Sequence, residues 1–179
     1  MSNSPRVISP RLTNELTYLI REKPRSYNSD RTIRFLLEHD LELGTLIFCR
    51  CRCRLHCSEM AIEIEERILE KEFLPLFMSD LIEIKDLLFS RALQQRLYGF
   101  AERLLDQHEY FTYPWLIAKT YPELREKVGE WFLADEFLDL VQIDYTLKFF
   151  STELQKKLIT RIENEGQYSL FEMLRENVG

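Results

Sequence analysis

Residues 90–97 carry the sequence Ser90-Arg91-Ala92-Leu93-Gln94-Gln95-Arg96-Leu97, and its pattern recurs twice further along the chain. The later copies are Tyr121-Pro122-Glu123-Leu124-Arg125-Glu126-Lys127-Val128 and Ser151-Thr152-Glu153-Leu154-Gln155-Lys156-Lys157-Leu158. The anchor leucines Leu93, Leu124 and Leu154 are 31 and then 30 residues apart, and a fainter copy occupies residues 9–16. Self-similarity at such a period is typical of stacked helix pairs, in which each pair buries its apolar face against the next.

Each copy predicts a helix, because a capping residue or a proline precedes apolar residues at helical spacing. We expect helices to begin at Ser90, near Pro122 and at Ser151 or Thr152. A second helix follows each: residues 110–119, a segment from Asp135 to Phe149, and residues 168–176. Gly166 would end the helix before the last one, and Leu170 would point inward.

The remaining composition also favours helices. The 179 residues include only five Gly and six Pro, too few for strands joined by tight turns. We therefore predict a single all-α domain over residues 1–179, built as a short stack of antiparallel helix pairs, an α-solenoid with a general likeness to HEAT-type arrays. The alternative is an irregular helical bundle, because any all-helical protein with elements of this length places leucines near this spacing.

The predicted stack is more regular in residues 81–179 than in residues 1–80. In the front part the pattern predicts helices near residues 9–20 and 30–40, and a short helix over residues 81–88 opens the regular part. One long helix or two abutting helices are expected over residues 46–71.

Charge is divided unevenly along the chain. Residues 1–58 hold ten Lys/Arg and six Asp/Glu, whereas residues 59–179 hold 14 and 24, so a mildly basic front precedes an acidic body. This division indicates either two binding surfaces or charge scattered on solvated faces. The density of basic residues is too low for a dedicated nucleic-acid binder. No secretory signal and no apolar run of membrane-spanning length is present, so we expect a cytoplasmic protein with no membrane contact.

Four cysteines lie within nine residues, in Cys49-Arg50-Cys51-Arg52-Cys53-Arg54-Leu55-His56-Cys57. On a helix, Cys49, Cys53 and Cys57 share one side with His56, where thiolates and imidazole could hold zinc. The spacing matches no established zinc motif. The plainer interpretation is buried cysteine at a close helix crossing. A third is redox sensing, with Cys51 on the opposite side as the reactive thiol because three arginines favour its thiolate.

No arrangement of residues predicts a reaction. The three histidines form no His-Glu-x-x-His or Glu-x-x-His pair, and the chain has no Gly-rich phosphate loop. Glu59, Glu63, Glu66 and Glu70, with Glu65 nearby, predict a solvated helix face. We therefore expect no enzymatic activity and no cofactor, with zinc as the alternative noted above.

Residues 110–115, Tyr110-Phe111-Thr112-Tyr113-Pro114-Trp115, place four rings in six positions, more than one helix stripe can bury. Exposed aromatic and arginine side chains are typical anchors in protein interfaces. The candidate partner-binding residues are Tyr110, Tyr113, Trp115, Arg50, Arg52 and Arg54. We expect a protein-binding module, either an adaptor or an inhibitor of the immunity type. Its partner would be another protein, and the acidic charge of residues 59–179 indicates a basic one. The alternative is a metal- or thiol-based sensor built on residues 49–57.

Overall fold

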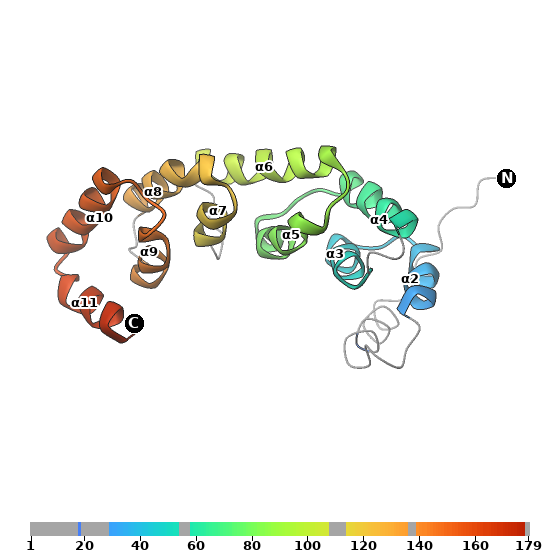
Figure 1. Cartoon of the computed structure of the whole chain (residues 1–179), viewed down its shortest axis with the longest axis horizontal. Helices are drawn as coiled ribbons and strands as arrows, with labels where there is room; N and C mark the ends of the chain where they lie inside the picture. Colours follow the sequence, from blue (N-terminus) through green and yellow to red (C-terminus); the bar gives the residue numbers. More distant parts are fainter. Residues whose placement is uncertain (1–17, 19–28, 54–57, 108–113, 136–138, 178–179) are drawn as a thin grey trace. The chain divides into compact units, whose positions relative to one another are not determined.

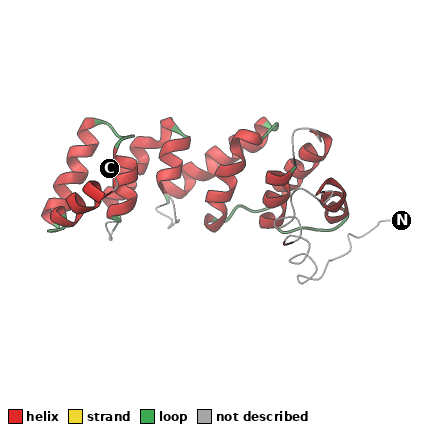
Figure 2. Cartoon of the chain, turned by 60° about the horizontal axis from the view of Figure 1, so that its bottom comes forward, coloured by secondary structure: helices red, strands yellow, loops and turns green. Residues whose placement is uncertain are grey.

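The structure is a computed structural model that describes residue 18 and residues 29–53, 58–107, 114–135 and 139–177. Every regular element of this part is helical, and no strand is present in it (Figure 2). The predicted all-α class is therefore confirmed. No helix among the described residues has both the length and the apolar character needed to cross a membrane.

Contacts divide the chain into two compact units, residues 1–96 and 97–179, and the boundary falls inside one helix. The elements of the first unit are α2 (Ser29–Leu37), α3 (Leu43–Arg52), α4 (Ser58–Glu70), the 3-10 turn η1 (Pro75–Phe77), α5 (Met78–Ile84) and the 3-10 turn η2 (Lys85–Leu87). Helix α6 (Arg91–Asp106) contains the boundary. The second unit continues with α7 (Pro114–Thr120), the 3-10 turn η3 (Pro122–Leu124), α8 (Arg125–Ala134), α9 (Leu140–Leu147), α10 (Thr152–Asn164) and α11 (Tyr168–Asn177).

In the second unit, helices that alternate along the chain pack side by side. Helix α9 contacts both α7 and α11, and α8 contacts α10, while α7 and α8 also pack on each other, as do α10 and α11 (Figure 1). The anchor leucines Leu124 and Leu154 are buried in this core. In the first unit, α3 packs against both α4 and α5, and Leu46, Ile64 and Leu81 are completely buried there.

The predicted helix ends are partly confirmed. Ser90 Oγ accepts a hydrogen bond from the Leu93 amide at 3.2 Å, and Ser151 Oγ accepts one from the Leu154 amide at 3.3 Å, so both serines are N-caps. Gly166 ends α10 with φ at 70°, a conformation that glycine adopts without strain.

Of the two alternatives for residues 46–71, the structure shows two helices, since α3 ends at Arg52 and α4 begins at Ser58. Two other sequence-based expectations are corrected. Asp135 does not open the next helix: it ends α8, and Asp139 is the N-cap of α9, accepting from the Gln142 amide at 3.0 Å. Leu170 points outward with 49% of its surface exposed, since Phe171 takes the buried position next to it. The fainter copy at residues 9–16 lies outside the described residues.

Candidate functional site

The clearest exposed cluster of aromatic side chains lies on α7 and α9, in the second unit. The rings of Trp115 and Tyr145 face each other with centroids 5.9 Å apart. Tyr145 is 46% exposed, and Val141, one turn earlier on α9, is equally open to solvent. Trp115, one of the predicted partner-binding residues, is half-buried, and its ring contacts the exposed ring of Tyr145.

The spacing of apolar residues in α9 explains why Tyr145 stays outside. Leu140, Ile143 and Leu147 follow the helical period and are buried against the neighbouring helices. Val141 and Tyr145 are four residues apart and lie on the opposite face. Val141 and Tyr145 were not predicted from the sequence, because a single helix was expected over residues 135–149 and its buried and exposed positions were not separated. Their position off the buried stripe was the available signal.

Basic side chains lie beside Trp115 and beside Phe149, which follows α9 in the chain. Lys119 Nζ lies 5.8 Å from the centroid of the Trp115 ring, and Lys148 Nζ lies 5.3 Å from that of Phe149. The Arg125 guanidinium also lies 5.3 Å from the Phe149 centroid, and its Nε donates to the Ala118 carbonyl at 3.0 Å. Lys119 and Lys148 stand at the carboxyl ends of α7 and α9, where the helix dipole favours positive charge. We call Trp115, Lys119, Val141, Tyr145 and Lys148 the α7–α9 surface.

Arg50, one of the predicted partner-binding residues, is instead part of the core. It is 2% exposed, and its Nε donates to Glu65 Oε1 at 2.8 Å while its Nη2 donates to the Leu87 carbonyl. A buried guanidinium that is already paired cannot meet a partner, so we leave Arg50 out of the binding surface. Arg52 remains partly exposed beside the Phe48 ring.

Glu65 also departs from expectation, because it is fully buried rather than part of the solvated acidic face. Besides binding Arg50, the Glu65 carboxylate accepts hydrogen bonds from the backbone amides of Phe89 at 3.1 Å and Ser90 at 2.8 Å. One ion pair thus ties α3 and α4 to the segment that leads into α6. A buried charge is tolerated when it is paired and hydrogen-bonded in this way.

The cysteine cluster shows no sign of activation in its described part. Cys49 and Cys53 are buried, and burial followed by the neighbouring Cys53 raises the pKa of Cys49 to about 12. Cys51 is exposed, yet desolvation and then the nearby Glu83 and Asp80 raise its pKa in spite of Arg50 and Arg52. A raised pKa keeps a thiol protonated and weakly nucleophilic.

Several predicted site residues cannot be placed. Tyr110, Tyr113, Arg54, His56 and Cys57 lie outside the described residues. Within the part of the chain that is described, no three His, Cys, Asp or Glu side chains are grouped closely enough to hold a metal ion. The proposed zinc ligands are therefore represented only by the buried pair Cys49 and Cys53.

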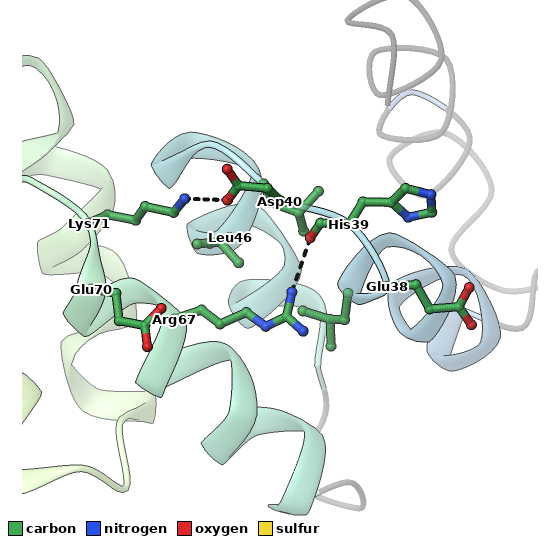
Figure 3. Close-up of a pocket in the computed structure, with 9 residues that line it drawn as sticks. Glu38, His39, Asp40, Leu46, Arg67, Glu70 and Lys71 are labelled. Carbon is green, nitrogen blue, oxygen red and sulfur yellow. Dashed lines mark hydrogen bonds and ion pairs between the residues drawn. The ribbon is translucent and has the colours of Figure 1, made fainter. Parts of the chain in front are cut away.

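A cavity of about 240 Å³ lies in the first unit, between the carboxyl end of α2 and α4 (Figure 3). Two contacts join lining groups of the cavity: Arg67 Nη1 donates to the His39 carbonyl at 3.1 Å, and Lys71 Nζ pairs with Asp40 at 2.7 Å. The His39 ring points away from Arg67 and lies tilted beside the Phe35 ring, with centroids 5.1 Å apart. These contacts join the end of α2 to α4.

Comparison of the chain with protein-family models, with curated proteins and with solved structures found no match.

Proposed function

We propose that this chain is a protein-binding module, an adaptor or an inhibitor, that uses the α7–α9 surface of a short stack of antiparallel helix pairs. The observation that carries the proposal is the pairing of the half-buried Trp115 ring with the exposed Tyr145 ring, whose centroids are 5.9 Å apart. Aromatic side chains held on rigid helices are the usual anchors of protein interfaces, because they bury much area at little entropic cost. The proposed role is binding and not catalysis.

A recurring contact supports the stacked arrangement. In both units, a basic side chain of one α-helix binds near the carboxyl end of the α-helix two positions earlier in the chain. Arg96 of α6 donates to the carbonyls of Leu69 and Lys71 at the end of α4, the latter at 2.7 Å. Lys127 of α8 pairs with Glu102 at 2.8 Å and Asp106 at 2.9 Å near the end of α6.

In the third copy of the repeated phrase, the basic residue that makes this contact lies one helical turn further from the anchor leucine. Arg161 of α10 donates to the Phe132 carbonyl at 2.6 Å and to the Asp135 carbonyl at the end of α8. Arg96 and Lys127 both stand three residues after their anchor leucines. A solenoid in the manner of HEAT arrays would produce such a contact once per repeat.

The thiol-based alternative has less support, because Cys49 is buried and the pKa values of Cys49 and Cys51 are both raised. The metal-based alternative depends on His56 and Cys57, which lie outside the described residues. Cys49 and Cys51 are unbridged thiols, a state that a reducing compartment favours, and we propose a cytoplasmic location accordingly.

The test compares capture by the tagged chain with capture by the double variant Trp115→Ala/Tyr145→Ala. A partner of this surface should lose at least about tenfold in affinity when both anchors are removed, as for interface hot spots. Ile62→Ala is the matched control, because Ile62 is an exposed apolar residue of the first unit (45% exposed). Equal affinity of the purified partner for all three proteins would refute the proposed surface.

A further inference from the structure

The charge around the α7–α9 surface differs in sign from that of the unit that carries it. Residues 97–179 contain nine Lys/Arg and fifteen Asp/Glu. Yet α7 has no acidic residue, and α9 has only Asp144, which is partly buried and interacts within the chain. The exposed ammonium groups of Lys119 and Lys148 therefore create a small basic region on an acidic body.

Each of these two lysines lies beside an aromatic ring. Lys119 lies against Trp115, and Lys148 and Arg125 lie against Phe149. An incoming side chain that is apolar can pack on Trp115, Tyr145 and Val141, and a carboxylate next to it would meet a lysine. Charge complementarity of this kind selects partners and sets the register of an interface.

We propose, on the basis of the proposed function, that the α7–α9 surface binds a peptide segment of a partner protein that carries carboxylate side chains beside aromatic or aliphatic ones. The net acidic charge of the chain alone suggested a basic partner; the local arrangement selects the opposite charge for the segment that docks here. At about 0.1 M salt, those acidic residues of the unit that lie more than about 10 Å from the two lysines are largely screened from them.

A nucleic acid also offers negative charge and rings that stack on aromatic side chains, but the observations favour a peptide. Nucleic-acid surfaces need basic residues along an extended track, because each phosphate of the strand carries a charge. The α7–α9 surface has two exposed lysines, Lys119 and Lys148, on a unit whose acidic residues outnumber its basic ones. A short peptide with a few carboxylates fits that limited region.

The experiment measures binding of three pools of short labelled peptides to the full chain by fluorescence anisotropy. The pools share Leu, Phe and Trp at the same positions and differ only in carrying Glu, Gln or Lys between them, and a random single-stranded oligonucleotide is the fourth probe. We expect the Glu pool to bind about tenfold more tightly than the Gln pool, and its affinity to fall as salt is raised.

Charge reversal supplies the decisive variant. Lys119→Glu/Lys148→Glu should remove the preference for the Glu pool and favour the Lys pool. Lys157→Glu should leave the preference unchanged, because Lys157 is exposed on α10, where it pairs with Glu153, and belongs to neither α7 nor α9. Circular dichroism checks that each variant is folded.

Four results would overturn the inference: no binding of the Glu pool, tighter binding of the Lys pool, preferential binding of the oligonucleotide, or a Glu preference that survives charge reversal. Its failure is distinguishable from that of the proposed function. If a captured partner loses affinity with Trp115→Ala/Tyr145→Ala but not with Lys119→Glu/Lys148→Glu, the surface is the binding site and only the assigned chemistry is wrong.

Discussion

Gly129 of α8 lies directly under the side chain of Leu154 of α10. A Cβ atom added to Gly129 would stand 2.0 Å from Leu154 Cδ2 and 2.8 Å from Leu154 Cγ. The third anchor leucine of the sequence pattern therefore packs on a position without a side chain. This close approach fixes the spacing of α8 and α10, which carry two successive copies of the repeated phrase.

Gly129→Ala should destabilise the second unit, because the new methyl group and the branched end of Leu154 cannot both occupy the space. Overpacking of this kind costs about 1–3 kcal/mol. Urea unfolding followed by circular dichroism measures the loss.

Gly99→Ala is the matched control, since Gly99 is exposed in α6 and a Cβ there would meet nothing within 4 Å. Alanine in an open helix interior should stabilise by about 0.5–1 kcal/mol. If Gly129→Ala were as stable as Gly99→Ala, the close packing of α8 and α10 would be wrong.

Leu124→Asp should unfold the second unit. Leu124 is 1% exposed and is the anchor leucine of the second copy, so the variant buries an unpaired carboxylate in the core. Leu170→Asp provides the comparison, because that side chain is about half exposed and should tolerate the charge within about 0.5 kcal/mol. A Leu124→Asp protein with wild-type thermal stability would show that the repeated leucines do not form the buried contact between successive helix pairs.

Glu65→Leu should cost about 3–5 kcal/mol, because it leaves the Arg50 guanidinium buried without its carboxylate. The double variant Arg50→Met/Glu65→Leu should recover part of that loss. Recovery stays incomplete, since the amides of Phe89 and Ser90 also lose their acceptor.

An exposed ion pair is the control for this double-mutant cycle. Glu153→Gln breaks the solvent-exposed pair with Lys157 and should change stability by less than about 0.5 kcal/mol. Additive effects of the two core substitutions would contradict a direct buried pair between Arg50 and Glu65.

Cys49 should make the fold sensitive to alkali. Its pKa is raised from 9.0 to about 12, so the native state holds the thiol proton more tightly than the unfolded chain does. The stabilisation that follows is complete below pH 9 and is lost as the pH rises toward 12. Between pH 9 and pH 12, the Cys49→Ala protein should therefore lose less of its free energy of unfolding than the wild type does. Chemical unfolding at a series of pH values measures this loss. Parallel curves for the two proteins would contradict the burial of this thiol.

The sequence predicted those features that local physics controls. Ser90 and Ser151 cap helices as expected, because a serine before an apolar stripe satisfies amides that no other group reaches. Gly166 ends α10 for a similarly local reason, its positive φ.

Features that depend on contacts between distant segments were missed. Glu65 lies in the sequence among the residues of an acidic helix face, yet its carboxylate is bound in the core by Arg50 and by the amides of Phe89 and Ser90. Likewise, Tyr145 is exposed because Ile143 and Leu147 hold α9 against its neighbours, and its position off this apolar stripe was the one local signal. The candidate surface was found only in part, through Trp115, since Tyr145 reaches it from another helix.

Hydrogen exchange of the full chain, with and without a purified captured partner, locates the binding surface directly. The proposed function predicts that slowed exchange concentrates in α7 and α9, residues 114–120 and 140–147, and that Trp115→Ala/Tyr145→Ala abolishes the slowing. Protection confined to the cavity between α2 and α4, or elsewhere in residues 29–96, would contradict it.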